Sequence, residues 1–177
     1  MRRTAIPVAA APGLRPTPDR VRETVFNWLE HLLPGWPQTS VLDMFAGTGA
    51  LGWESASRGA RRVTMIERQP RAAQALRELQ ARLQCPAVEV VQGDALQLAA
   101  RMPAASLDLV FVDPPYDSGL LPAALAAAAR LLRPEGLVYV ESARPLDAAA
   151  LEACRLEPVR AGRAGAVHFH LLRALSC

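Results

Sequence analysis

The sequence contains no lysine, so all 20 of its basic residues are arginine. With 17 acidic residues they give a formal net charge of +3. A GC-rich coding sequence would produce this bias. A requirement for guanidinium groups, which bind phosphates through paired hydrogen bonds and stack on bases, would produce it too. A net charge this small does not by itself indicate nucleic-acid binding, because a clustered patch matters more than the total.

Cysteine and long apolar runs are also scarce. Cys85, Cys154 and Cys177 have neither metal-ligand spacing nor the even number of a disulfide framework. We therefore expect unpaired thiols in a reducing compartment and no metal site. The stretch Ala123–Ala129 is too short to span a bilayer, and residues 1–11 lack the sustained apolar segment of a secretory signal. These absences predict a cytoplasmic protein without membrane contacts.

The length of 177 residues, of which 51% are hydrophobic, suits one globular domain. Residues 1–16 are rich in Pro and Ala and are predicted to form an N-terminal arm, with the domain itself at residues 17–177. Thr17-Pro18-Asp19 combines a capping hydroxyl, a first-turn proline and an acid, which predicts a helix start. Apolar residues then follow at helical spacing until the segment 34–37, whose two prolines end the helix.

From residue 41 onward, short apolar runs alternate with helical stretches, which predicts a doubly wound α/β sheet with helices on both faces. The buried parallel strands are predicted at 41–45, 63–66, 88–91, 107–112 and 137–140. The helices are predicted near 50–59, 70–83, 94–102 and 119–132. Two last strands, near 155–160 and 166–173 with a turn over 161–165, form an antiparallel hairpin. This mostly parallel seven-stranded sheet with a C-terminal hairpin is typical of the class I methyltransferase (Rossmann-like) fold.

The loop Asp43–Gly52 follows the first of these strands and opens a helix. Its glycines have the spacing Gly47-x-Gly49-x-x-Gly52, which permits a tight turn and the close approach of a nucleotide. This spacing alone fits both NAD and S-adenosyl-L-methionine. Asp43 favours the second, because a carboxylate suits the ammonium group of a methionine moiety better than a pyrophosphate.

Two further acids support the same cofactor. Glu67 lies 20 residues past Gly47 at a predicted strand end, where it can accept hydrogen bonds from a ribose diol. Asp94 follows the third strand, where it can accept from an adenine amino group or cap the next helix, and the two roles are compatible.

The segment Asp113-Pro114-Pro115-Tyr116 comes just past the strand predicted at 107–112, at the edge where open α/β sheets bind ligands. Proline lacks an N–H and restricts its neighbours, so the loop is predicted to be a rigid set of acceptors, chiefly the Asp113 carboxylate and the Pro114 carbonyl. Such acceptors hold the N–H bonds of an aromatic amine and stabilise the charge that develops on its nitrogen. The Tyr116 ring suits base stacking. The segment predicts methylation of a nucleobase amine, with guanine and adenine both open.

Residues 14–29, LRPTPDRVRETVFNWL, resemble the leading signature of the bacterial 16S ribosomal RNA guanine-N2 methyltransferases of the RsmD type. The Asp43–Gly52 loop, Glu67, the Asp113–Tyr116 segment and Tyr139-Val140-Glu141 match that family in the same order. The resemblance implies methyl transfer from S-adenosyl-L-methionine to N2 of guanine 966 in 16S rRNA. It implies a substrate in the 30S subunit or an assembly intermediate, and we expect the enzyme to be a monomer.

The resemblance and the motifs together predict the site. The expected cofactor-binding residues are Thr17, Arg20, Asp43, Phe45, Ala46, Gly47, Gly49, Glu67, Arg68, Asp94 and Ala95. The expected catalytic residues are Asp113, Pro114 and Tyr116, and the expected substrate-binding residues are Arg15, Arg22, Asn27, Pro115 and Arg163. From the residues alone, Arg20, Glu23 and Asn27 share a polar helix face, which is also typical of a solvated surface.

The family has a basic, Gly-rich strand before this arm. Here the chain begins Met1-Arg2-Arg3, so we expect that strand to be absent or shortened, which would weaken the grip on RNA phosphates. Three alternatives remain: an adenine-N6 methyltransferase on DNA or RNA, a nicotinamide oxidoreductase, and a non-catalytic RNA-binding module. The first is disfavoured because the chain has no obvious DNA-recognition domain. The second is disfavoured because 177 residues leave little room for a substrate domain. The third is disfavoured because the Asp113–Tyr116 segment is intact.

Overall fold

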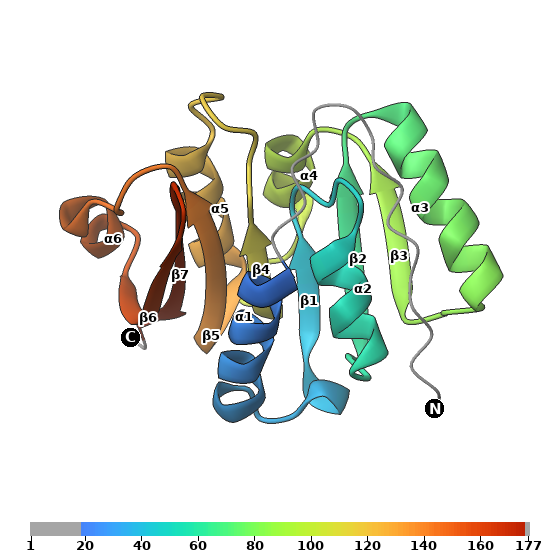
Figure 1. Ribbon diagram of the computed structural model, residues 1–177, viewed down its shortest axis with the longest axis horizontal. Coiled ribbons are helices and arrows are strands. Elements are labelled where there is room, and N and C mark those ends of the chain that lie inside the picture. Colours follow the sequence, from blue (N-terminus) through green and yellow to red (C-terminus); the bar gives the residue numbers. More distant parts are fainter. Residues whose placement is uncertain (1–18, 176–177) are drawn as a thin grey trace.

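One seven-stranded sheet organises the structure, a computed structural model that describes residues 19–175 (Figure 1). Its strand order is β3-β2-β1-β4-β5-β7-β6. The strands are β1 (Ser40–Asp43), β2 (Arg62–Glu67), β3 (Val88–Gln92), β4 (Leu107–Val112), β5 (Leu132–Ser142), β6 (Leu156–Ala164) and β7 (Val167–Ala174). The first five strands pair in parallel, and β7 pairs antiparallel with both β5 and β6. This confirms the predicted fold class.

The helices connect the strands and cover both faces of the sheet. They are α1 (Asp19–Leu32), α2 (Ala50–Ser57), α3 (Pro70–Leu83), α4 (Ala95–Arg101), α5 (Leu121–Leu131) and α6 (Ala148–Ala153), with a short 3-10 turn, η1 (Trp36–Gln38). The predicted arm at residues 1–16 and the predicted helix-start residues Thr17 and Pro18 lie outside the described residues. Within residues 19–175, no helix has the length and apolar character needed to cross a bilayer.

Alternation along the central strands divides the core into two layers, because successive strand residues point to opposite faces. On one face, Phe111 of β4 contacts Phe26 of α1 and Tyr139 of β5, with ring centroids 5.9 and 6.0 Å apart. Helices α2 and α3 add buried residues to this layer. On the other face, Val110 and Val112 pack with buried residues of α4, α5 and α6. Figure 1 shows α1 and α2 in front of the sheet and α4 and α5 behind it.

The structure confirms most predicted elements, with several boundaries shifted by one or two residues and two boundaries shifted further. Strand β5 begins at Leu132 instead of residue 137, and its register with β4 shifts between Leu107 and Leu109. The residues between 132 and 137 include a proline and Glu135 with φ 65°, so the strand bulges here. The sequence of this part therefore lacks the pattern of a regular strand. The six-residue helix α6 was not predicted, although Asp147 caps it by accepting a hydrogen bond from the Ala149 N–H.

The turn predicted over 161–165 is the second correction, because β6 continues to Ala164 and only Gly165 and Ala166 connect the two strands. Gly162, which suggested a turn, pairs with Phe169 inside the hairpin. A Cβ at Gly162 would overlap the Phe169 ring. This glycine therefore serves the close approach of a ring rather than a change of chain direction.

The sheet reverses its order between β1 and β4, which makes their carboxyl ends the topological switch point. Asp43, the last residue of β1, pairs with Phe111 of β4. Because these strands are parallel, the loops that follow them open side by side at one edge. The glycine loop and the Asp113–Tyr116 segment, which lie far apart in the sequence, therefore meet there.

Candidate active site

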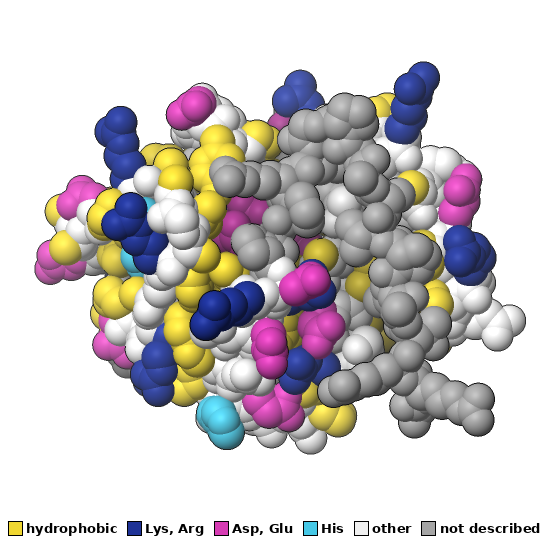
Figure 2. All heavy atoms as spheres, viewed as in Figure 1, with side chains coloured by type: hydrophobic (Ala, Val, Ile, Leu, Met, Phe, Trp, Pro, Cys, Tyr) yellow, Lys and Arg dark blue, Asp and Glu magenta, His cyan; other side chains and the backbone are white. Residues whose placement is uncertain are grey.

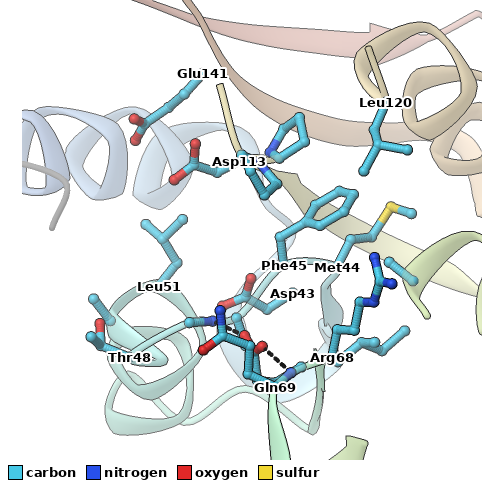
Figure 3. A pocket seen from close by; sticks show the side chains of 18 of the residues that line it. Asp43, Met44, Phe45, Thr48, Leu51, Arg68, Gln69, Asp113, Leu120 and Glu141 are labelled. Atoms are coloured by element: carbon cyan, nitrogen blue, oxygen red, sulfur yellow. Dashed lines mark hydrogen bonds between the residues drawn. The ribbon is translucent and has the colours of Figure 1, made fainter. Parts of the chain in front are cut away.

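A cavity of about 880 Å³ lies at the carboxyl edge of the parallel strands (Figure 3). Its walls come from the loops that follow β1, β2, β3 and β4, from the end of β5, and from the tip of the β6–β7 hairpin. The predicted site residues that line it are Asp43, Phe45, Ala46, Gly47, Glu67, Arg68, Asp94, Ala95, Asp113, Pro114, Pro115 and Tyr116. The structure thus brings the predicted cofactor and catalytic segments into one space.

The glycine loop and Glu67 are tied together by backbone hydrogen bonds. The Gly47 N–H donates to Glu67 Oε2 at 2.8 Å, and the Gln69 N–H donates to Glu67 Oε1 at 2.7 Å (dashed in Figure 3). Gly47 has φ 54°, a conformation that favours glycine. Each oxygen of a carboxylate can accept more than one hydrogen bond. Glu67 is therefore oriented by the loop and still able to accept from the hydroxyls of a ribose.

Asp43 lies at the floor of the cavity, where its side chain is almost completely buried. Its Oδ2 accepts a hydrogen bond from the Gly52 N–H at 3.1 Å, which ties the end of β1 to the start of α2. Burial, with the nearby charge of Glu67 as a smaller cause, raises the pKa of Asp43 to about 7, although N–H groups of Gly52 and Phe45 oppose the rise. A cationic ligand would favour the ionised form of this carboxyl.

Asp94 lines the cavity beyond the end of β3 and also begins α4. Its Oδ1 accepts a hydrogen bond from the Gln97 N–H at 3.0 Å, so the capping role considered in the sequence is present. The cap holds the carboxylate at the cavity wall between Gly93 and Ala95. Capping and ligand binding thus remain compatible at this position.

Asp113 and Pro114 stand at the other end of the cavity, just past β4. Pro114 is buried, whereas Tyr116 is 42% exposed and lies at the mouth. Burial raises the pKa of Asp113 to about 8, with further contributions from the negative charges of Glu141 and Asp43. The segment therefore combines a half-buried carboxyl that can hold or release a proton near neutral pH with an aromatic ring open to solvent.

Glu141 is a cavity residue that the sequence patterns did not assign to the site. It is 6% exposed, lines the cavity and accepts a hydrogen bond from the Tyr139 hydroxyl at 2.8 Å. Figure 3 shows its carboxylate and that of Asp113 projecting into the same part of the cavity. The sequence carried a signal for it, because Glu141 follows a predicted strand as Asp113 does, and parallel strands end at one edge.

The remaining predicted residues that the structure describes are not among those that line this cavity. Gly49 is buried behind it with φ 77°, where an added Cβ would lie 2.6 Å from Leu76 Cδ2 and 2.7 Å from Trp53 Nε1. This glycine shapes the loop through packing. Among the α1 residues, Arg20 and Asn27 are exposed, and Arg22 forms an ion pair with Asp19 at 2.8 Å.

Arg163 is exposed on the hairpin beside Ala164, which does line the cavity. Its Nε donates to the Gly165 carbonyl at 2.9 Å. Among the residues that Figure 2 colours by type, the basic side chains on the face shown are scattered rather than gathered in one patch. Arg15 and Thr17 lie outside the described residues.

The charges of the cavity identify the kind of cofactor it can hold. Among its described lining residues, the acids are Asp43, Glu67, Asp94, Asp113 and Glu141, and the base is Arg68. Such a lining attracts the sulfonium and ammonium groups of S-adenosyl-L-methionine and repels the pyrophosphate of NAD. Within residues 19–175, no group of three or more His, Cys, Asp or Glu side chains is suited to hold a metal ion. The sheet, the glycine loop and this cavity together define a class I methyltransferase whose cofactor is S-adenosyl-L-methionine.

Comparisons with known proteins identify the family. The family model described as Conserved hypothetical protein 95 matches residues 1–173. Ribosomal RNA small subunit methyltransferase D of Escherichia coli (strain K12) is 42% identical over 139 residues, which cover 77% of this chain and 68% of that protein. The protein of the same name from Haemophilus influenzae is 39% identical over 142 residues, covering 77% and 72%. The chain belongs to this RsmD family.

Solved structures agree with this assignment. A putative methyltransferase from Escherichia coli superimposes with a TM-score of 0.79 at 34% identity, covering 96% of this chain and 91% of that one. A SAM-dependent methyltransferase from Aquifex aeolicus has a TM-score of 0.66 at 17% identity, with 89% and 93% covered. The second similarity shows the shared fold alone.

Proposed function

We propose that this chain transfers a methyl group to the exocyclic N2 of one guanine in 16S ribosomal RNA, at position 966. We further propose that its substrate is the 30S subunit or an assembly intermediate, and that it acts as a cytoplasmic monomer. The observation that carries the reaction is the rigid Asp113–Tyr116 segment, which lines the same cavity as the glycine loop. The choice of ribosomal RNA is supported by the names of the related proteins.

S-adenosyl-L-methionine, when bound, supplies an electrophilic methyl group on a sulfonium. The residues suited to hold it are Glu67 for the ribose hydroxyls, Asp94 for the adenine amino group and Asp43 for the methionine ammonium group. These three carboxylates line successive parts of the cavity, at the end of β2, after β3 and at the end of β1. This arrangement leaves the Asp113 end of the cavity for the base.

Asp113 and the carbonyl of Pro114 accept the two N–H bonds of the guanine amine and thereby orient its lone pair. The new N–C bond forms as the bond between the methyl carbon and the sulfonium sulfur breaks. The nitrogen is then positively charged and must lose one proton. Burial raises the pKa of Asp113 to about 8 in the free protein, and a cationic cofactor beside it favours the ionised form that can accept this proton. Asp113 thus serves as acceptor during attack and as proton acceptor afterwards.

The base must leave its stack before its amine can reach a half-buried carboxyl. The exposed ring of Tyr116 offers a stacking surface at the mouth of the cavity, an interaction worth about 1–3 kcal/mol per base. Pro115, beside it, is also exposed and lines the cavity. Arg163 on the hairpin, together with Arg22 and Asn27 of α1, would contact the surrounding RNA.

Methyl incorporation from tritiated S-adenosyl-L-methionine tests this function. We expect incorporation into 30S particles from a strain that lacks the endogenous activity, and none into double-stranded DNA. Mass spectrometry of the product RNA should then locate one N2-methylguanosine. Incorporation into adenine instead would reject the guanine assignment, and no incorporation into either 30S particles or naked 16S RNA would reject the ribosomal substrate. Calorimetric titration with S-adenosylhomocysteine and with NAD provides an independent check of the cofactor.

A further inference from the structure

We propose that Glu141 is the residue that distinguishes guanine from adenine, by accepting the guanine N1–H while Asp113 and the Pro114 carbonyl accept the N2 hydrogens. This inference rests on the proposed function and adds a base-reading residue to it. Guanine presents three adjacent donors on this edge, one on N1 and two on N2. The cavity supplies three acceptors for them.

The sheet register places Glu141 beside Asp113. Phe111 pairs with Tyr139, and Val112 pairs with Val140. The residues that follow the last of these pairs along the chain are Asp113 and Glu141. Asp113 and Glu141 lie two positions after Phe111 and Tyr139 and therefore project toward the same face. The electrostatic influence of Glu141 on Asp113 agrees with this proximity. Figure 3 shows both carboxylates directed into the same part of the cavity.

The hydroxyl of Tyr139 fixes the Glu141 side chain. Tyr139 lies in β5 and is completely buried, and its ring packs edge-on against Phe111 of β4. Its O–H donates to Glu141 Oε1 at 2.8 Å, so one carboxylate oxygen is oriented by a rigid partner. A residue held in this way reads a hydrogen-bonding pattern more strictly than a mobile one, because its acceptors cannot turn away from a wrong base.

The chemistry of the two purines then decides which base fits. Adenine carries its amine on C6 and has an unprotonated N1, which is an acceptor. A carboxylate accepts hydrogen bonds and, when ionised, donates none. The lone pair of adenine N1 would therefore face a lone pair of the Glu141 carboxylate. Two buried acceptors without a donor between them raise the free energy of the complex. Guanine N1–H satisfies the same oxygen.

A substituted base tests this contact. 2-Aminopurine keeps the amine on C2 but has an unprotonated N1 and no oxygen on C6. The comparison of wild type with Glu141→Gln then separates the N1 contact from the loss of that oxygen. We expect the wild-type protein to methylate RNA with 2-aminopurine at the mapped position with a kcat/KM lower by roughly 10- to 100-fold than guanine RNA, the range for removal of one base contact. In Glu141→Gln the amide can donate to N1, so the preference for guanine should shrink by at least about 10-fold.

Matched variants separate recognition from folding. Glu152→Gln makes the same chemical change at an exposed position of α6 and should keep the wild-type preference. Tyr139→Phe removes the hydroxyl that orients Glu141 and should weaken the preference partially. Binding of S-adenosylhomocysteine to Glu141→Gln, measured by calorimetry, should stay within a few-fold of wild type.

The comparison of the two bases within each protein is the decisive readout. If Glu141→Gln binds S-adenosylhomocysteine normally and retains the full wild-type preference for guanine over 2-aminopurine, Glu141 does not read N1 and the proposal is wrong. A wild-type protein without that preference would overturn it equally. Failure of the proposed function is distinct, because it would appear as no methylation of guanine RNA by the wild-type protein.

Discussion

At the scale of single residues, the chemistry of the site comes from buried carboxyl groups. Asp43, Asp113 and Glu141 lie at the carboxyl ends of the neighbouring strands β1, β4 and β5. Asp43 and Asp113 have raised pKa values because burial removes water that would stabilise their charge. Donor groups and positive charges of the ligands would replace that water. The free site is therefore suited to bind ligands that carry N–H groups and positive charges.

The substitution Asp113→Ala tests the acceptor role. We expect kcat to fall by roughly 100- to 10,000-fold, because the variant can neither orient the amine nor accept its proton. The affinity for S-adenosylhomocysteine, measured by calorimetry, should change by no more than a few-fold, since the glycine loop and Glu67 remain. Asp117→Asn in the same exposed loop is the control and should retain activity. Equal turnover of Asp113→Ala and wild type would remove Asp113 from the mechanism.

At the scale of elements, the loop between β1 and α2 depends on a glycine that has no place in the cavity lining. Gly49 begins α2 in the left-handed conformation and lets Leu76 of α3 and Trp53 approach its backbone. The sequence could indicate a glycine loop here, and its spacing suggested that Gly49 would contact a ligand. The neighbours that surround Gly49 come partly from another helix, so its packing role could be seen only in the folded chain.

A pair of glycine substitutions separates conformation from packing. Gly49→Ala introduces both a strained backbone and an overlap with Leu76 and Trp53, whereas Gly59→Ala introduces strain alone, since nothing lies within 4 Å of its added Cβ. We expect Gly59→Ala to lower the free energy of unfolding by about 1 kcal/mol, and Gly49→Ala to lower it by about 1–3 kcal/mol more. Urea denaturation measures both values. Equal decreases would contradict the packing role of Gly49.

At the scale of the whole molecule, the buried acids couple stability to pH and to the cofactor. Their folded pKa values of about 7 for Asp43 and about 8 for Asp113 lie above the ordinary value of 3.8. The folded protein therefore binds more protons than the unfolded chain between these limits, and its stability decreases as pH rises. The stabilising contribution is fully present below about pH 3.8 and is lost as pH passes through about 7 and 8.

The pH dependence gives a direct test on the cofactor-free protein. For each of the two groups, the free energy of unfolding should fall with rising pH by up to about 1.4 kcal/mol per unit. Asp113→Asn, which cannot ionise, should have a flatter profile than wild type between pH 6 and 8. S-adenosyl-L-methionine should stabilise the wild type more at pH 8 than at pH 6, because its positive charge favours the ionised carboxyls. Parallel profiles of wild type and Asp113→Asn would contradict the raised pKa.

Patterns of neighbouring residues are sufficient to predict the order and type of most elements, because strand and helix periodicities are local properties. The limits of β4 and α3 follow directly from such patterns, and so do the glycine loop and the acceptor segment. Local patterns misjudged the start of β5 and the hairpin turn, where a bulge and a ring packed on Gly162 override the usual meaning of proline and glycine.

Which of these segments act together depends on how the chain folds. Glu141 is one acid among 17 in the sequence, and it joins the site because β5 lies beside β4 in parallel with a defined register. The pKa values of Asp43 and Asp113 likewise depend on burial by residues far away in the chain. Periodicity is a property of neighbouring residues in the chain. The proximity of the three carboxyl groups and the loss of water around them arise only when distant strands meet at one edge of the sheet.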